Sequence, residues 1–196
     1  MPIPRPRTWY LILAVCALAG LLLAGPAPAE AEIRIGNLSV FFNDFDVTVQ
    51  VVLLGAIPAS LHESLHSGVP THVRYHIELW QYSRFWVERM VQTRMVERQL
   101  TYNVLTKEYR VASINGEQQN EPYLTKNLRE AQRVLSDLRL SKLAPGASLD
   151  GRELYYVRVR ADVALNGQNS WVARMTGDAA ETPWIQSNLL TPSRSQ

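Results

Sequence analysis

Residues 72–79 read His-Val-Arg-Tyr-His-Ile-Glu-Leu, and no other stretch of the chain indicates the fold as strongly. Apolar and polar side chains alternate through it without a break. Successive side chains of a β-strand point to opposite faces of its sheet, so this alternation predicts a strand with one buried and one solvent-facing side. The buried side would carry Val73, Tyr75, Ile77 and Leu79, and the solvent-facing side would carry His72, Arg74, His76 and Glu78.

The residues before this strand predict a β-hairpin. Alternating apolar residues flank the turn sequence Asn43-Asp44: Ile33, Ile35, Leu38, Val40 and Phe42 come before it, and Val47, Val49, Val51 and Leu53 come after it. Two such runs around a short polar turn are typical of a hairpin with one buried face. The alternation slips by one residue at Gly36-Asn37, which predicts a bulge.

Further strands are expected after the central one. Residues 85–102 are mostly β-like, residues 109–111 follow a turn at Thr106-Lys107, and residues 154–165 form a long run that ends at Asn166-Gly167. Asn115-Gly116 is a strong turn sequence. Strands therefore outnumber helices, and short turns join most of them.

Two helices are also expected. The segment 58–67 begins with a proline, places Leu61 and Leu65 on one face and is followed by Gly68, a common end signal. A longer helix is predicted near residues 124–139, where apolar residues recur at spacings of four and three: Leu124, Leu128, Ala131, Leu135 and Leu138. The predicted fold class is therefore mainly β, an antiparallel β-sandwich or curled sheet with two helices.

Residues 1–29 are expected to form a secretory signal peptide. Arg5 and Arg7 provide a basic start, residues 9–23 are apolar, and cleavage is expected after Ala29 or, as a second choice, after Ala31. The apolar run is shorter than the roughly 20 residues that a helix needs to cross a bilayer, which favours cleavage over a retained N-terminal anchor. The protein is therefore expected in the periplasm, with no membrane span once the signal is removed.

The remainder of the chain is expected to be a single β-rich domain, residues 30–190, followed by a loose polar tail over residues 191–196. Outside the predicted signal, basic and acidic residues are equal in number. This balance argues against nucleic acid as a partner, because such binding needs a clear basic excess. Cys16 is the only cysteine and lies within the signal, so the mature protein would have neither disulfides nor thiol chemistry.

One motif is typical of catalytic chemistry. The sequence His62-Glu63-Ser64-Leu65-His66 matches H-E-x-x-H, in which two histidines on one helix face bind zinc and the glutamate is the general base. His72 follows six residues later, where a longer form of this motif has its third ligand. On this hypothesis His62, His66 and His72 are metal ligands, and the protein is a zinc-dependent hydrolase with Glu63 as its base.

Three features weigh against the zinc hypothesis. The glycine of the longer motif should be the third residue after the second histidine, but Gly68 is the second. Only about 32 residues separate the predicted cleavage site from His62, too few for the sheet that normally supports such a helix. His72 also begins a strand, on its solvent-facing side. The favoured interpretation is a surface helix without catalytic residues, metal or other cofactor.

An aromatic group follows the central strand and consists of Trp80, Tyr82, Phe85 and Trp86. A groove lined by these rings would make the protein a carrier of small hydrophobic or envelope molecules. Packing in a core or an interface is the commoner use of such rings and is the expectation here. The sequence contains no nucleophile elbow, phosphate-binding loop or dinucleotide motif.

Four stretches of the chain together resemble a known family. They are residues 65–70 leading into 73–79, residues 100–111, residues 128–135 and residues 155–160. In order and spacing they resemble a proteobacterial family of exported proteins classed as a domain of unknown function. Genes of that family are often neighbours of a nitrogen-responsive sensor kinase and response regulator. The resemblance covers about residues 33–165; it implies an exported, mainly β protein and supplies no catalytic residues.

These observations favour a non-enzymatic periplasmic domain that binds or assists a protein partner in the cell envelope. The resemblance adds a membrane sensor kinase as one such partner. The zinc-dependent hydrolase is the alternative hypothesis, and the carrier of hydrophobic molecules is a third. The ring nitrogens of His62, His66 and His72 separate the first two, because zinc holds its nitrogen ligands about 2.0–2.1 Å from a common point.

Overall fold

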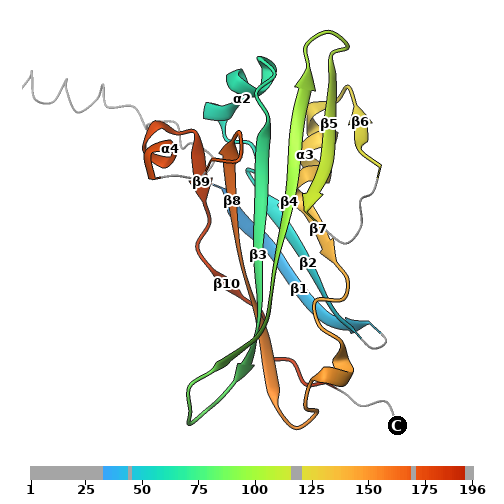
Figure 1. Cartoon of the computed structure of the whole chain (residues 1–196), viewed down its shortest axis with the longest axis vertical. Helices are drawn as coiled ribbons and strands as arrows, with labels where there is room; N and C mark the ends of the chain where they lie inside the picture. Colours follow the sequence, from blue (N-terminus) through green and yellow to red (C-terminus); the bar gives the residue numbers. More distant parts are fainter. Residues whose placement is uncertain (1–32, 44–45, 116–120, 169–170, 193–196) are drawn as a thin grey trace, which may run out of the picture. The chain divides into compact units, whose positions relative to one another are not determined.

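The strand predicted from residues 72–79 lies at the centre of the larger of two antiparallel sheets (Figure 1). It is β3 (Thr71–Tyr82), which pairs with β4 (Arg89–Asn103) on one side and with β8 (Leu154–Leu165) on the other. Its four alternate apolar residues, Val73, Tyr75, Ile77 and Leu79, are fully buried, which confirms the predicted alternation.

The computed structural model describes residues 33–43, 46–115, 121–168 and 171–192. The predicted signal peptide, residue 44 of the first predicted turn, residue 116 of the predicted Asn-Gly turn and residues 193–196 of the predicted tail lie outside this part. None of the helices within it combines the length and the hydropathy that crossing a bilayer requires.

The larger sheet has seven strands, in the order β10-β8-β3-β4-β5-β6 with β9 beside β8. The strands not yet introduced are β5 (Glu108–Asn115), β6 (Tyr123–Thr125), β9 (Ala179–Glu181) and β10 (Ile185–Gln186). β8 covers the predicted run 154–165 and is followed by the predicted turn, where Asn166 and Gly167 both have positive φ. β4 begins four residues later than the predicted β-like stretch 85–102.

The smaller sheet has three strands, in the order β1-β2-β7. β1 (Arg34–Asn43) and β2 (Asp46–Leu54) form the predicted hairpin, and β7 (Asp137–Leu140) pairs with β2. The register shifts between Ile35 and Asn37, which confirms the predicted bulge. β1 and β2 cross obliquely behind the larger sheet (Figure 1).

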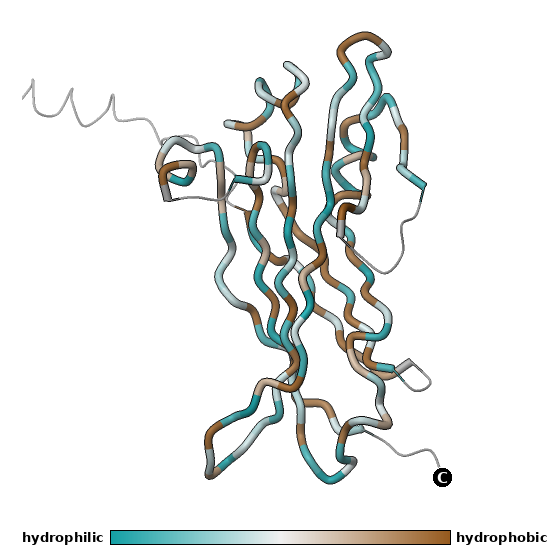
Figure 2. Tube along the Cα trace, viewed as in Figure 1, coloured by the Kyte–Doolittle hydropathy of each residue, from teal (hydrophilic) through white to brown (hydrophobic). Residues whose placement is uncertain are grey.

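Both sheets contribute to one hydrophobic core. β2 supplies Val47, Val49, Val51 and Leu53, and the facing strands β3 and β8 supply their own alternate apolar residues. Figure 2 shows this alternation of apolar and polar residues along the strands. The predicted fold class, mainly β with antiparallel sheets, is therefore confirmed.

The short predicted helix is present as α2 (Ala59–His66). Pro58 precedes its first turn, and the chain leaves the helix at Gly68, whose φ of +89° is accessible to glycine because it has no Cβ. Leu61 and Leu65 are fully buried, as their shared face predicted.

The longer predicted helix is shorter in the structure. α3 covers only Leu128–Ser136, because Asn127 caps its first turn by accepting a hydrogen bond from the amide of Arg129 (3.0 Å). Leu124 belongs instead to β6, and Leu138 belongs to β7. The apolar residues spaced by four and three therefore belong to three elements, β6, α3 and β7, and not to one helix. The sequence pattern also did not predict α4 (Trp171–Thr176) or the 3-10 turn Gly146–Ser148.

Two side chains of the larger sheet hold the C-terminal end of α3. The Tyr75 hydroxyl donates to the carbonyls of Leu135 (3.0 Å) and Ser136 (3.1 Å), and Arg98 Nη1 donates to the carbonyl of Val134 (2.5 Å). The last carbonyls of a helix have no partner within it, and these bonds from the sheet satisfy them. Burial raises the pKa of Tyr75 and lowers the pKa of Arg98.

Candidate functional site

The histidines of the H-E-x-x-H motif form hydrogen bonds within their own part of the fold. His62 Nε2 donates to the carbonyl of Ile57 (3.2 Å). His66 Nδ1 donates to the carbonyl of His62 (2.8 Å), and its Nε2 is 2.8 Å from the hydroxyl of Tyr109. The rings of Tyr102 and Tyr109 also contact the His66 ring edge-on.

The third predicted ligand, His72, lies on β3 and has different partners. Its Nδ1 is 2.7 Å from Oε1 of Glu97, and its Nε2 is 3.0 Å from the side-chain amide of Gln99. Glu63, the predicted base, is exposed on α2. Among the described residues, no group of three His, Cys, Asp or Glu side chains is arranged to hold a metal ion. The structure therefore does not assemble His62, His66 and His72 into one metal centre.

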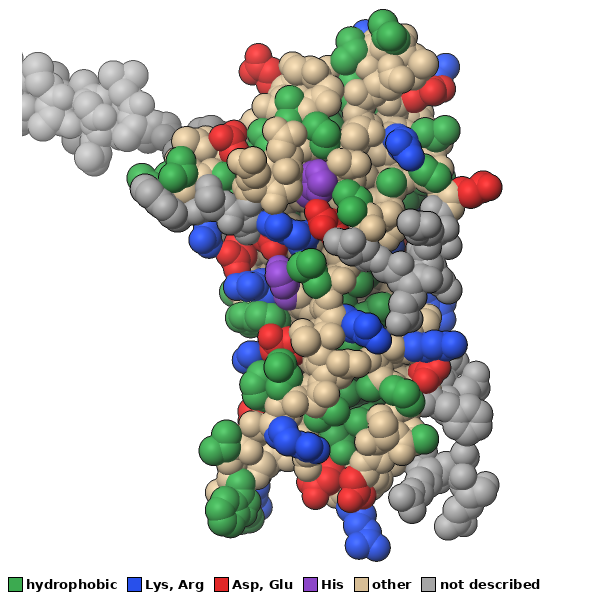
Figure 3. All heavy atoms as spheres, in the orientation of Figure 1, with side chains coloured by type: hydrophobic (Ala, Val, Ile, Leu, Met, Phe, Trp, Pro, Cys, Tyr) green, Lys and Arg blue, Asp and Glu red, His purple; other side chains and the backbone are tan. Residues whose placement is uncertain are grey.

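A network of ion pairs covers the side of the larger sheet that faces away from the core. We call this side the outer face; its β3 residues are His72, Arg74, His76, Glu78 and Trp80, and it continues onto β4 and β8. The prediction of a solvent-facing side holds only in part, because the four predicted residues, His72, Arg74, His76 and Glu78, are partly buried. Figure 3 shows histidine, basic and acidic side chains lying together on this face.

Asp162 on β8 is the most deeply buried acid of the outer face. Its side chain is 4% exposed and accepts hydrogen bonds from Arg74 Nε (2.8 Å) and His76 Nε2 (2.9 Å), both on β3. A buried carboxylate is costly unless it is paired and hydrogen-bonded. Arg74 and His76 therefore compensate this burial, and they connect the two central strands through side chains as well as backbone.

Two arginines of β8 are stacked on tryptophan rings. The Arg158 guanidinium lies 4.4 Å from the ring centre of Trp80 and 4.8 Å from that of Trp184, and it donates to Glu78 (2.6 Å). Arg160 lies 4.9 Å from the Trp184 ring centre and pairs with an acid of β9. Cation–π contacts and ion pairs thus hold both guanidinium groups against the sheet.

The predicted aromatic group does not line a common groove. Trp80 lies on the outer face, where its Nε1 donates to Glu78. Phe85 and Trp86 lie in the loop beyond the ends of β3 and β4, and they are 84% and 85% exposed. The expectation from the sequence is packing in a core or an interface. Phe85 and Trp86 do not pack in the core, because at the end of this hairpin they lie beyond the residues that form it, and packing in an interface stays a prediction.

The base of the β3–β4 hairpin is fastened to the sheet. Tyr156 of β8 donates a 2.5 Å hydrogen bond to the carboxylate of Glu88, just before β4 begins. Arg89 donates two hydrogen bonds to the side chain of Gln81 on β3 (2.9 and 3.2 Å). These contacts hold both arms of the hairpin where it leaves the sandwich.

The contact between Tyr156 and Glu88 predicts a loss of stability at alkaline pH. Burial, reinforced by the hydrogen bond to Glu88, raises the pKa of Tyr156 from 10.0 to about 12. A tyrosine whose pKa is raised by folding stabilises the folded state fully below pH 10, and this contribution is lost as the pH rises through 12. The free energy of unfolding should therefore fall between pH 10 and pH 12, and less steeply in Tyr156→Phe.

Urea denaturation at several pH values across this range measures the slope. Tyr123→Phe is the matched control, since Tyr123 is 39% exposed. Equal slopes in the wild type and Tyr156→Phe would contradict the prediction.

Along half of β4, the described residues place a strand on one side only. β5 pairs with β4 only from Glu97 to Asn103. The preceding residues, Arg89–Val96, pair with β3 and, in the part of the chain that the structure describes, have no strand on their other side. The amide of Thr93 donates to the side chain of Gln92 (3.2 Å) and not to β3, so it points along this side. We call Arg89–Val96 the β4 edge.

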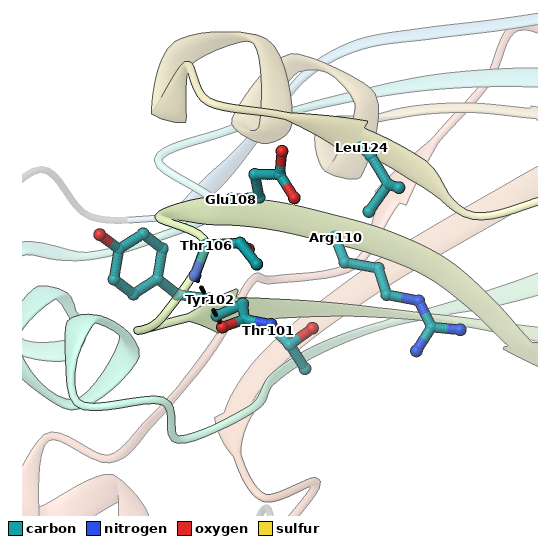
Figure 4. A pocket seen from close by; sticks show the side chains of 7 residues that line it. Thr101, Tyr102, Thr106, Glu108, Arg110 and Leu124 are labelled. Carbon is teal, nitrogen blue, oxygen red and sulfur yellow. Dashed lines mark hydrogen bonds between the residues drawn. The ribbon is translucent and has the colours of Figure 1, made fainter.

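A shallow hollow lies at the other end of β4 (Figure 4). It has a volume of about 310 Å³ and is lined by Thr101, Tyr102, Asn103, Thr106, Glu108, Arg110 and Leu124. Figure 4 shows the charged side chains of Glu108 and Arg110 projecting from β5, with Leu124 opposite them on β6. Ligand pockets are mostly concave and apolar. The charged lining of this hollow favours a solvated surface.

Comparison with known protein families classifies the chain. Residues 30–174 match the family described as "Domain of unknown function (DUF4390)". The chain belongs to this family. Comparisons with the curated proteins and with the solved structures found no match. The expected membership of a family classed as a domain of unknown function is therefore confirmed.

The DUF4390 segment contains most of the outer face and the whole β3–β4 hairpin. Trp184, which stacks on Arg158 and Arg160, lies beyond its end at residue 174. Sequence reasoning missed Asp162 as a central residue of this DUF4390 chain. Arg158, Arg160 and Asp162 alternate within an apolar run, and this pattern could have indicated a charged face on the strand. It could not identify their partners, because these depend on which strand lies beside β8.

Proposed function

We propose that this DUF4390 protein is an exported, non-enzymatic domain of the cell envelope that binds a protein partner. The observation that carries the proposal is the backbone of the β4 edge, which pairs with β3 and, among the described residues, has no strand on its other side. An open strand edge presents backbone donors and acceptors to which a strand of a partner can add. Affinity then comes from main-chain hydrogen bonds, and specificity comes from alternate side chains.

The side chains of the β4 edge are suited to this mode of binding. Met90 and Met95 are 49% and 47% exposed, and methionine adapts its shape to different partners. The Thr93 amide donates to the neighbouring side chain of Gln92, a partner that it can exchange for a carbonyl of an added strand. The edge contains no proline, which would block such pairing.

Two sequence expectations support the cellular setting of the proposal. The predicted signal over residues 1–29 favours export to the periplasm. The resemblance to a family encoded beside a sensor kinase favours a membrane sensor kinase as the kind of partner.

Cross-linking in living cells tests the proposal. A photoreactive amino acid at Met95 should yield one discrete cross-linked protein, whereas the same group at Met175, an exposed methionine on α4, should not. Thr93→Pro should abolish the cross-link, because it removes the amide that points along the edge but no hydrogen bond to β3. Thr93→Ala keeps that amide and should retain the cross-link.

Two results would overturn the proposal. One is equal cross-linking in Thr93→Pro and Thr93→Ala when both variants melt like the wild type. The other is recovery of the protein in the cytoplasm, and not in the periplasmic fraction, after cells are fractionated. Neither result depends on whether the protein contacts a membrane.

A further inference from the structure

Three consecutive apolar residues project from the end of the β3–β4 hairpin. Phe85, Trp86 and Val87 are 84%, 85% and 94% exposed. Figure 2 shows an apolar segment at the end of this hairpin, and Figure 3 shows hydrophobic side chains protruding there. Single exposed apolar residues are ordinary on protein surfaces, whereas a contiguous projecting group indicates a contact with something outside the chain. We call Phe85–Val87 the apolar tip.

Hydrogen bonds in the turn and at the base of the hairpin hold the apolar tip in place. The amide of Trp86 donates to the hydroxyl of Ser83 (3.0 Å), which closes the turn. The hydrogen bonds of Tyr156 to Glu88 and of Arg89 to the β3 arm fix the base of the hairpin. A tip that is held in place before binding loses little conformational freedom when it binds.

Basic residues flank the apolar tip on both sides. The Arg84 guanidinium lies 5.6 Å from the ring centre of Phe85, and Arg89 follows two residues after Val87. The acid of this segment, Glu88, accepts the hydrogen bond from Tyr156 at the base. Aromatic rings flanked by arginines match the headgroup region of a bilayer, where tryptophan is enriched and guanidinium groups bind phosphate.

The shape of the apolar tip favours a bilayer over a folded protein. A stable protein interface buries about 800 Å² on each partner and involves roughly 20–30 residues on each side. A tip of three side chains, each at least 84% exposed, is a convex point that offers only a small part of such an area. A fluid bilayer needs no complementary shape, because lipids rearrange around an inserted side chain.

We infer that the apolar tip, Phe85–Val87, inserts into the interfacial region of an anionic phospholipid bilayer, with Arg84 and Arg89 at the lipid phosphates. This contact is separate from the partner site at the β4 edge and goes beyond the proposed function. It holds the hairpin end of the larger sheet against the membrane surface, so a strand added to the β4 edge lies beside the bilayer.

Vesicle binding tests the inference with the protein recovered from the periplasm of producing cells. Its N-terminus is first defined by mass spectrometry, and the same processed form is used for every variant. Co-sedimentation with phosphatidylcholine vesicles containing phosphatidylglycerol should show binding. Phe85→Ser/Trp86→Ser should weaken it by at least about tenfold, because two rings of 150–250 Å² each no longer leave water. Leu105→Ser is the matched control, a residue 92% exposed at the β4–β5 turn, and should bind like the wild type.

The arginines are tested by lipid charge. Arg84→Glu should lose binding to vesicles with phosphatidylglycerol more strongly than binding to pure phosphatidylcholine vesicles. Lipids brominated near the headgroup should quench the tryptophan fluorescence of the wild type but much less that of Trp86→Phe. Thr93→Pro should leave vesicle binding unchanged, which separates this inference from the proposed function.

Two outcomes would overturn the inference. One is equal vesicle binding by the wild type and Phe85→Ser/Trp86→Ser, with both melting alike. The other is no binding to either vesicle type, together with loss of the Met95 cross-link in Phe85→Ser/Trp86→Ser. That second result would assign the apolar tip to a protein partner.

Discussion

Leu65→Ala is expected to lower the free energy of unfolding by about 2–5 kcal/mol. Leu65 is fully buried and belongs to the core shared by both sheets. The substitution removes apolar contacts and leaves a cavity. α2 is a short helix that ends at the turn before Gly68, so it can shift only a little to fill that space. Urea denaturation followed by circular dichroism measures the loss.

His66→Ala is the matched control on the same helix. His66 is exposed, and the substitution gives up its hydrogen bond with Tyr109, so a loss of about 1 kcal/mol or less is expected. A zinc ligand would behave differently, because metal binding then contributes to folding. We expect a chelator to leave the melting temperature of the wild type unchanged. A chelator-sensitive wild type that His66→Ala renders insensitive would restore the zinc hypothesis.

Arg74→Met is expected to cost about 3–5 kcal/mol, as is usual when one partner of a buried ion pair is removed. The Asp162 carboxylate is 4% exposed and loses its contacts with Arg74 Nε (2.8 Å) and Nη2 (2.7 Å), while the bond from His76 remains. The methionine covers a similar volume but donates nothing. The large effect therefore comes from the desolvated carboxylate, and denaturant titration at neutral pH measures it.

Two further variants show whether the buried carboxylate is responsible. Arg174→Met removes an arginine that is 48% exposed and also pairs with an acid, and it should cost about 1 kcal/mol or less. Arg74→Met/Asp162→Leu removes the carboxylate as well and should be more stable than Arg74→Met alone. A double variant less stable than Arg74→Met would contradict this explanation.

The strands were predictable where one face of a sheet is buried. Val73 and Tyr75 alternate with polar residues because β3 packs one face on the core, and β8 and the β1–β2 hairpin follow the same rule. The error at α3 has a local cause. The spacing of Leu124 and Leu138 suited a helix, but the cap at Asn127 and strand pairing on both sides confine the helix to Leu128–Ser136.

The ion pairs and the exposed tip were not predictable from local patterns. Arg74 and Asp162 are 88 residues apart in sequence, and only the pairing of β3 with β8 brings them together. Phe85 and Trp86 are apolar, and the sequence alone contains no sign that the hairpin carries them past the sandwich. Their exposure depends on where the neighbouring elements end, which is a property of the whole fold.

If the chain is exported as proposed, the pairing of β3 with β8 also sets an order of events. Translocation delivers the N-terminal residues first, so β3 must wait for its central partner until residues 154–165 have crossed. Pairings between segments so distant in sequence form slowly. The entropy of closing a long loop is lost before any contact between the strands contributes favourable free energy. The hairpins before β8 can form earlier, but until β8 arrives β3 lacks one of its two neighbouring strands. The larger sheet would then be completed only when the last quarter of the sequence, which contains β8, β9 and β10, becomes available.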